Sequence, residues 1–324
     1  MAKTWKYIRA TLARTGYSTK ETTKNIKILN ILKNNTLHYI DGDNIKKTNL
    51  ILENTLIKST KKYDIILVFG QSNTCYGTGL DPTIDFAVDG INQIGRYGEN
   101  NHKIIQAIEP LQNSDEFLIT SNRIGLALTF AKLYKEHYLA SDREIVIIPC
   151  GKGSSGFINN FWNPGDSSYE DAILRTNEVL NLNFDNRLVA ILWQQGEADT
   201  WNINYQQNLD NMITNLRNDI VNYNIKTPFL LGGFVPYWLN LEDTTGTVRK
   251  ETTNNIIKDT QNRLPYCYYV DPSSPTVIEK ENPEVESVHY DAPSLRELSA
   301  RYFEKYQSHI FKITHIQVPG LPTR

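Results

Sequence analysis

Cysteine, long apolar runs and an excess of either charge are scarce in this 324-residue sequence. Its three cysteines, Cys75, Cys150 and Cys267, lie far apart and predict neither a disulfide framework nor a zinc site. No apolar stretch approaches the ~20 residues that span a bilayer, and the N-terminus lacks the apolar core of a signal peptide. The formal net charge of −2 offers no basic surface for nucleic acid. We therefore expect synthesis in a cytosol, reduced cysteines, no nucleic-acid partner and no membrane insertion.

Two regions differ in their patterning. Residues 1–60 contain short apolar runs with polar interruptions and an Asp41-Gly42-Asp43 turn, a pattern typical of short strands and hairpins. We predict a small β-rich region there, which attaches the chain to an assembly partner or makes it a homo-oligomer. The main domain is predicted at 61–315 and a C-terminal tail at 316–324. The overall 40% of hydrophobic residues is enough for a sizeable core.

The main domain alternates between two kinds of apolar pattern. Continuous apolar runs, typical of buried parallel strands, occur at 63–69, 144–149, 187–193, 228–235 and 266–270. Helical patterns lie between or after them, at 122–138, 205–223 and 293–307. This alternation predicts an α/β protein, a three-layer α/β/α fold of flavodoxin-like type with a mainly parallel, five-stranded sheet. Ligands bind such sheets beyond the carboxyl ends of the strands, so we expect chemistry in the segments that follow them.

Those segments hold the side chains that acyl transfer requires. Ser72 follows the first strand, and a serine hydroxyl becomes a good nucleophile when a base takes its proton. His289, just before the last helix, can be that base, and Glu286 can hold its imidazole in the right tautomer. The backbone N–H groups of Ser72 and Gly153 and the side chain of Gln195 are candidate donors for an oxyanion hole.

The same blocks resemble the SGNH hydrolases, in particular the carbohydrate esterases that include sialate O-acetylesterases and acetylxylan esterases. The resemblance covers about residues 64–306. It rests on Gly70-Gln71-Ser72-Asn73 for G-Q-S-N, on Trp193–Glu197 for W-x-Q-G-E, and on the stretch 105–111. It implies that Ser72 is the nucleophile, that His289 is the base, and that Gln195 and a glycine of the second block complete the oxyanion hole.

The sequence departs from the family pattern in two places. The family usually ends in D-x-x-H, whereas Glu286 stands at the acid position here. The second block is usually G-G-[ST], and here it reads Gly153-Ser154-Ser155. We take Gly153 as the oxyanion residue and hold Gly151 in reserve.

Several roles remain open at this stage. Asp291 or Glu284 can orient His289 in place of Glu286. Candidate substrate-binding residues are Asn73, Trp162, Glu197 and Trp201. Core packing fits both tryptophans equally well, and bracing of its own loop fits Glu197 better. The carboxylates at 197 and 199 have no histidine cluster beside them, so we predict no metal and no cofactor.

Together these features predict a serine esterase that removes O-acetyl or similar short acyl groups from a glycan through an acyl-serine intermediate. The alternative is a structural or glycan-binding protein, for instance of a virus particle or tail, that retains the fold with weak or no activity. An intact serine, histidine and oxyanion glutamine argue against this alternative, because a binding module has no use for a polarised serine.

Overall fold

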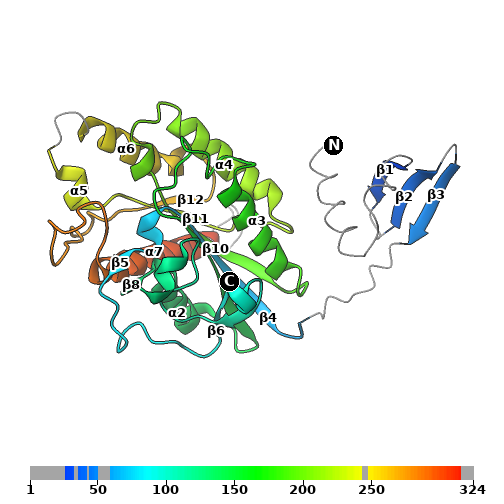
Figure 1. The fold of residues 1–324 in the computed structure, drawn as a ribbon, viewed down its shortest axis with the longest axis horizontal. Coiled ribbons are helices and arrows are strands. Elements are labelled where there is room, and N and C mark those ends of the chain that lie inside the picture. Colours follow the sequence, from blue (N-terminus) through cyan, green and yellow to red (C-terminus); the bar gives the residue numbers. More distant parts are fainter. Residues whose placement is uncertain (1–25, 33–35, 42–43, 50–58, 243–246, 315–324) are drawn as a thin grey trace, which may run out of the picture. The chain divides into compact units, whose positions relative to one another are not determined.

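A computed structural model describes residues 26–32, 36–41, 44–49, 59–242 and 247–314, and Figure 1 shows its ribbon. The chain divides into two compact units, Met1–Lys58 and Ser59–Arg324. In the first unit, β1 (Ile26–Leu32), β2 (Thr36–Asp41) and β3 (Asn44–Asn49) form an antiparallel sheet in that order. The attachment or oligomerisation role of residues 1–60 stays a prediction, and the tail at 316–324 lies outside the described residues.

A seven-stranded sheet forms the centre of the second unit as the structure describes it. In the order in which they pair, its strands are β12 (Cys267–Val270), β11 (Phe229–Gly232), β10 (Arg187–Gln194), β4 (Lys62–Gly70), β9 (Arg143–Gly151), β6 (Ile91–Ile94) and β7 (Ile104–Gln106). All neighbours are parallel except β6 and β7. The mainly parallel α/β fold is confirmed, but five strands was too few. The two missed strands are short, and Asn92 and Gln93 interrupt the apolar residues of β6.

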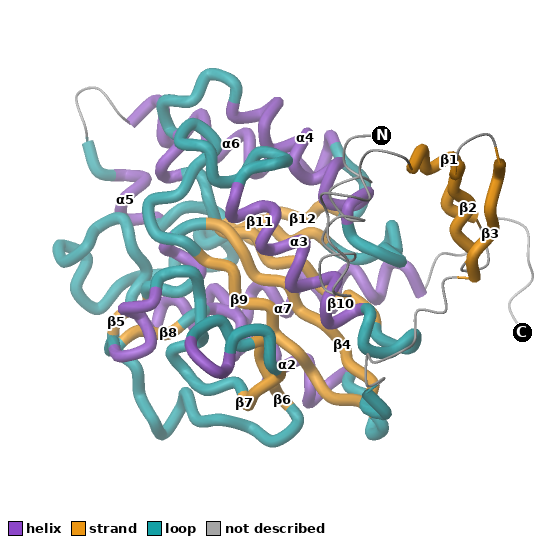
Figure 2. The backbone as a smooth tube through the Cα atoms, turned by 45° about the vertical axis from the view of Figure 1, so that its right-hand side comes forward, coloured by secondary structure: helices purple, strands orange, loops and turns teal. Residues whose placement is uncertain are grey.

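Helices cover both faces of this sheet. The helices are α2 (Leu126–Tyr138), α3 (Ser167–Leu180), α4 (Tyr205–Asp219), α5 (Pro236–Asn240), α6 (Thr247–Arg263) and α7 (Ala292–Thr314). Side chains of α3, α4 and α6 pack in one apolar cluster, and those of α2 and α7 pack in another. Strand β4 supplies alternate residues to the two clusters, Leu67 to the first and Val68 to the second. Figure 2 shows the strands running between these groups of helices, which is the predicted three-layer arrangement.

The strand order brings three chain segments together at the carboxyl edge of the sheet. Strand β4 lies between β9 and β10, so the loops that follow these strands are neighbours. The backbone N–H of Gln71 donates to the carbonyl of Gln194 (2.9 Å), and that of Lys152 donates to the carbonyl of Gly70 (3.0 Å). Gly70 has φ +126°, and a Cβ on it would lie 2.2 Å from the Gln194 oxygen. Only glycine therefore lets β4 end this close to β10.

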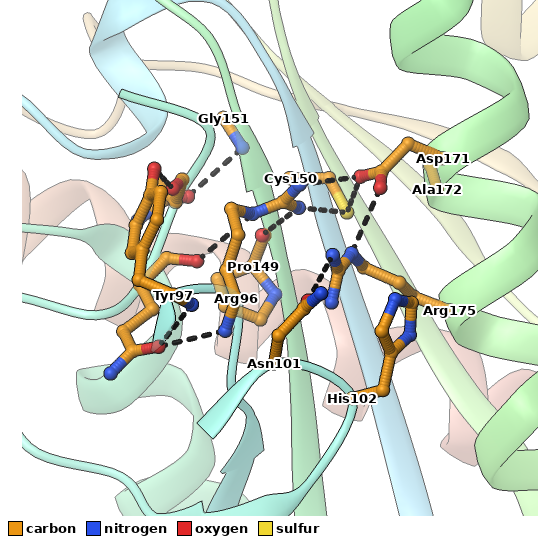
Figure 3. A network of polar contacts seen from close by, with 12 residues as sticks. Arg96, Tyr97, Asn101, His102, Pro149, Cys150, Gly151, Asp171, Ala172 and Arg175 are labelled. Carbon is orange, nitrogen blue, oxygen red and sulfur yellow. Dashed lines mark hydrogen bonds and ion pairs between the residues drawn. The ribbon is translucent and has the colours of Figure 1, made fainter. Parts of the chain in front are cut away.

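A polar network fixes the end of β9 from the side opposite β4 (Figure 3). Arg96 donates from Nη2 to the carbonyl of Pro149 (3.0 Å) and pairs through Nη1 with Asp171 of α3 (2.8 Å). Asp171 also pairs with Arg175 (2.9 Å). These charge-assisted contacts hold the start of the glycine-rich turn at 150–156 in place.

The stretch 105–111 also has a structural role. Its buried Glu109 accepts hydrogen bonds from the backbone N–H groups of Leu111 (3.0 Å) and Gly125 (3.1 Å), just before α2 begins. Burial raises the pKa of Glu109 to about 8. Among the described residues, no helix combines the length and apolar character needed to cross a membrane.

Candidate active site

Ser72 lies at the point where β4 ends. It begins the short 3₁₀ helix η1 (Ser72–Thr74) and is 4% exposed. Its Oγ lies 2.9 Å from Nε2 of His289, a residue 217 positions away in the chain. Within the described part of the chain, no acceptor contacts the Ser72 backbone N–H. The structure thus places a hydroxyl against an imidazole, with a free amide on the same residue.

His289 lies in the loop before α7 and is mostly buried, with 19% of its side chain exposed. Burial lowers its pKa below the usual value, and the nearby Glu286 carboxylate opposes that shift only in part. The imidazole is therefore mainly neutral at pH 7 and able to accept a proton from Ser72. The ring of Tyr76 packs beside it, with the two ring centroids 5.4 Å apart.

Glu286 contacts the other nitrogen of His289, with Oε2 3.4 Å from Nδ1. Its Oε1 pairs with Nη2 of Arg123 (2.8 Å). Burial alone would raise the pKa of Glu286, but the Arg123 guanidinium and His289 together outweigh burial and hold the pKa below its usual value. Lys280 donates from Nζ to the carbonyls of Val285 (2.9 Å) and Glu286 (2.8 Å), which holds this loop in place.

The other two candidate acids are placed differently. Asp291 accepts hydrogen bonds from the backbone N–H groups of Glu281 (2.8 Å) and Ser294 (3.0 Å), so it supports the start of α7. Glu284 is exposed. Among the described carboxylates, only Glu286 contacts the imidazole, although 3.4 Å is long for a hydrogen bond.

Asn73 connects the serine to the histidine loop through its side-chain amide. Nδ2 donates to the carbonyl of Val288 (2.9 Å) and to Oε1 of Glu197 (2.6 Å), while Oδ1 accepts from the backbone N–H of Tyr290 (3.0 Å). The residues on both sides of His289 are therefore held by the residue that follows Ser72. These inward bonds indicate positioning rather than the substrate contact considered from the sequence.

Two of the three expected oxyanion donors have acceptors within the protein. The Gly153 backbone N–H donates to Oδ2 of Asp115 (2.6 Å), which also accepts from the Tyr76 hydroxyl (2.8 Å). Gln195 donates from Nε2 to Asp199 (2.6 Å). The reserve residue Gly151 donates to Asn113 (2.9 Å). Of the three expected donors, only the Ser72 amide is without an acceptor among the described residues.

The second block has a further peculiarity at Ser154. This residue, which stands where the family usually has glycine, has φ +53°. The left-handed region favours glycine because it has no Cβ. Within the described residues no acceptor contacts the backbone N–H of Ser154.

The remaining candidates lie in different environments. Trp162 is fully buried, and its Nε1 donates to Ser155 Oγ (2.8 Å), so its position favours core packing over contact with a sugar. Trp201 is 60% exposed, with the Arg249 guanidinium 3.0 Å from its ring centroid.

Glu197 is buried, and burial raises its pKa to about 7. Its Oε2 has no hydrogen-bond partner among the described residues. Its Oε1 accepts from Asn73 and so joins the loop after β10 to the turn after β4, while bracing of its own loop stays a prediction.

Three residues near the site gave no signal in the sequence. Arg123, Asp115 and Lys280 lie in loops or short elements, and each acts on a partner distant in the chain or on a loop backbone. No pattern of spacing identifies such partners before the fold is known. Among the described residues, no group of three His, Cys, Asp or Glu side chains is gathered to hold a metal ion.

Known proteins with related sequence and fold include several esterases. The probable carbohydrate esterase At4g34215 of Arabidopsis thaliana is 31% identical over 101 residues, so the match spans 30% of this chain and 37% of that protein. The crystal structure of NanS has a TM-score of 0.66 at 20% identity, covering 78% of this chain and 98% of NanS. XAC1771, a carbohydrate acetylesterase from Xanthomonas citri, has a TM-score of 0.52 at 13% identity, covering 85% of this chain and 61% of that one. The two structures show a shared fold.

The family assignment rests on a longer match. Residues 62–308, more than half of the 324-residue chain, match the sequence model of the family described as "carbohydrate esterase, sialic acid-specific acetylesterase". This match confirms the resemblance to SGNH-type carbohydrate esterases. The chain therefore belongs to this family of carbohydrate acetylesterases.

Proposed function

We propose that the chain is a serine esterase that removes O-acetyl groups from an acetylated carbohydrate through an acyl-serine intermediate. Membership of a carbohydrate acetylesterase family supports the reaction and the substrate class. The observation that carries the mechanism is the 2.9 Å contact between Ser72 Oγ and His289 Nε2 at the carboxyl edge of the sheet. The family description makes O-acetylated sialic acid the first sugar to test.

The reaction follows from the order of these contacts. Ser72 Oγ attacks the acetyl carbonyl carbon while its proton passes to Nε2 of His289. The tetrahedral intermediate collapses, the bond between the carbonyl carbon and the sugar oxygen breaks, and His289 returns the proton to that oxygen. Water then attacks acetyl-Ser72 with His289 as base, acetate leaves, and Ser72 regains its proton. Glu286 stabilises the imidazolium that forms in each step.

The oxyanion needs donors aimed at the developing charge. The open Ser72 N–H supports a role for that amide. For the Gly153 amide to contribute, Asp115 has to release it, because one carboxylate oxygen now occupies that donor. Gln195 is likewise held by Asp199. We propose that substrate binding rearranges at least one of these contacts.

The alternative of a binding or structural protein without activity is not favoured. The chain belongs to a family described as esterases, and the serine and histidine are in hydrogen-bond contact. A particle or tail protein needs neither feature. An assembly partner for residues 1–60 remains a separate proposal.

Replacement of Ser72 by alanine tests the proposed function. We expect Ser72→Ala to lower kcat on 4-nitrophenyl acetate and on acetylated sialic acid by about 10⁴-fold or more, with an unchanged circular dichroism spectrum. The matched control is Ser141→Ala, at an exposed serine in the turn before β9, at the opposite edge of the sheet. Substantial turnover by a folded Ser72→Ala variant would remove Ser72 as the nucleophile.

A further inference from the structure

An aromatic pair extends from the catalytic histidine to the surface. The Tyr76 ring packs beside His289, and the Phe117 ring meets Tyr76 edge to face, with centroids 5.7 Å apart. Phe117 is 58% exposed. The pair thus forms a continuous apolar surface from the imidazole outward, which neither the sequence motifs nor the family match assigned to any role.

The pair is firmly supported. The Tyr76 hydroxyl donates to Asp115 (2.8 Å), and the Arg123 guanidinium lies 4.8 Å from the Tyr76 ring centroid. Phe117 belongs to the 3₁₀ helix η3 (Glu116–Thr120), whose Leu118 is buried. The Phe117 ring is therefore presented on a fixed base, and a pre-ordered ring loses little entropy when it binds a ligand.

The chemistry of the reaction predicts which part of the substrate lies beside His289 and this aromatic pair. His289 returns a proton to the leaving oxygen, so that oxygen comes within hydrogen-bond reach of Nε2. In a carbohydrate ester this oxygen belongs to the sugar. The sugar ring must then rest on the surface next to His289, and the exposed part of that surface includes the aromatic pair. Apolar C–H groups on the face of a sugar ring pack well on an aromatic ring.

We propose that Phe117, supported by Tyr76, binds the sugar ring of the acetylated carbohydrate on the leaving-group side of His289. The proposal rests on the proposed esterase function and adds a subsite to it. The tryptophans suggested by the sequence are less suitable, because Trp162 is fully buried and Arg249 already stacks on Trp201.

The test compares esters with and without a sugar ring. The sugar probe is whichever of acetylated N-acetylneuraminic acid, xylose and glucose the wild type cleaves fastest, and ethyl acetate is the ring-free ester. We expect Phe117→Ala to lower kcat/KM for the sugar ester by about 10-fold, mainly through a higher KM. The kcat/KM for ethyl acetate should stay within about twofold of the wild-type value. Phe117→Trp, which keeps an aromatic ring at this position, should retain most of the wild-type kcat/KM for the sugar ester. Phe184→Ala, at a residue 82% exposed before β10, is the matched control.

Each other outcome has a definite meaning. An equal loss on both esters would overturn the proposal, because Phe117 would then only support the catalytic residues. Unchanged kinetics on both would also overturn it and place the sugar elsewhere. If the wild-type chain is inactive on every ester, the proposed esterase function is overturned. If it cleaves only ethyl acetate, the proposal that its substrate is an acetylated carbohydrate is overturned, and the sugar subsite with it.

Discussion

Glu286 is one methylene longer than the aspartate usual in this family, and it lies in a tight turn. Its backbone adopts φ +48°, a conformation that is uncommon for a non-glycine residue. The backbone N–H of His289 donates to the Glu286 carbonyl (2.7 Å), which closes a tight turn around the acid. Arg123 holds one carboxylate oxygen, so the other faces the imidazole. These contacts favour Glu286 as the acid of the triad.

We predict that Glu286→Gln lowers kcat by about 10²-fold, because an amide favours the wrong imidazole tautomer. It should also shift the pH profile. Glu286 raises the pKa of His289, whereas burial lowers it. Loss of the carboxylate charge therefore lowers that pKa further. Activity requires neutral His289, so the acid limb of kcat/KM should lie below pH 6.5 in the wild type and move to still lower pH in the variant.

Two neighbouring carboxylates serve as controls for this prediction. Glu284→Gln and Asp291→Asn remove the same charge nearby and should change kcat little. A near-wild-type kcat in Glu286→Gln would remove Glu286 from the triad and leave the backbone to orient His289. A large loss in Asp291→Asn, in a variant that remains folded, would transfer the role to Asp291.

At the scale of elements, the site depends on how the turn after β4 is joined to the loop before α7. Asn73 makes this connection at Val288 and Tyr290. We predict that Asn73→Ala lowers kcat by about 10- to 100-fold with little change in KM for a small ester, because a displaced His289 loses its alignment with Ser72. Steady-state kinetics on 4-nitrophenyl acetate checks the prediction.

The matched control is Asn92→Ala in β6. Asn92 also makes side-chain contacts between neighbouring strands, to Glu144 (2.9 Å) and to the Ile145 carbonyl (3.3 Å). Urea unfolding should show a comparable loss of stability in both variants, whereas only Asn73→Ala should lose kcat. Equal kinetic losses in the two would mean that Asn73 acts through general stability alone.

Some of this architecture was predictable because it depends on local pattern. Continuous apolar runs indicate buried strands, and the rule for parallel sheets then brings the segments with Ser72, Gly153 and Gln195 to one edge. Strand β7 was missed because three residues carry too little pattern. The contact between Asp115 and Gly153 joins residues 38 positions apart, and no local preference encodes it.

At the scale of the whole molecule, the residues assigned to the site all belong to the second unit. The family match, residues 62–308, also lies within it. Ser59 is a natural first residue for this unit, because its carbonyl accepts from Asn183 (3.0 Å) and its hydroxyl accepts from the Lys61 backbone N–H (3.1 Å). The ion pair between Lys61 and Glu144 (2.6 Å) then fastens the start of β4 to β9.

We predict that a chain beginning at Ser59 keeps kcat/KM on 4-nitrophenyl acetate within about twofold of the full-length chain, because every group in the proposed chemistry and both apolar clusters remain. The measurement pairs initial rates with circular dichroism, and Ser72→Ala in the shortened chain supplies the background rate. A shortened chain with a native spectrum but no activity would contradict the prediction, since the first unit would then contribute to the site. Normal activity on this small ester together with a weakened rate on an acetylated polysaccharide would instead assign residues 1–58 to substrate attachment, because only the large substrate extends beyond the catalytic edge of the sheet.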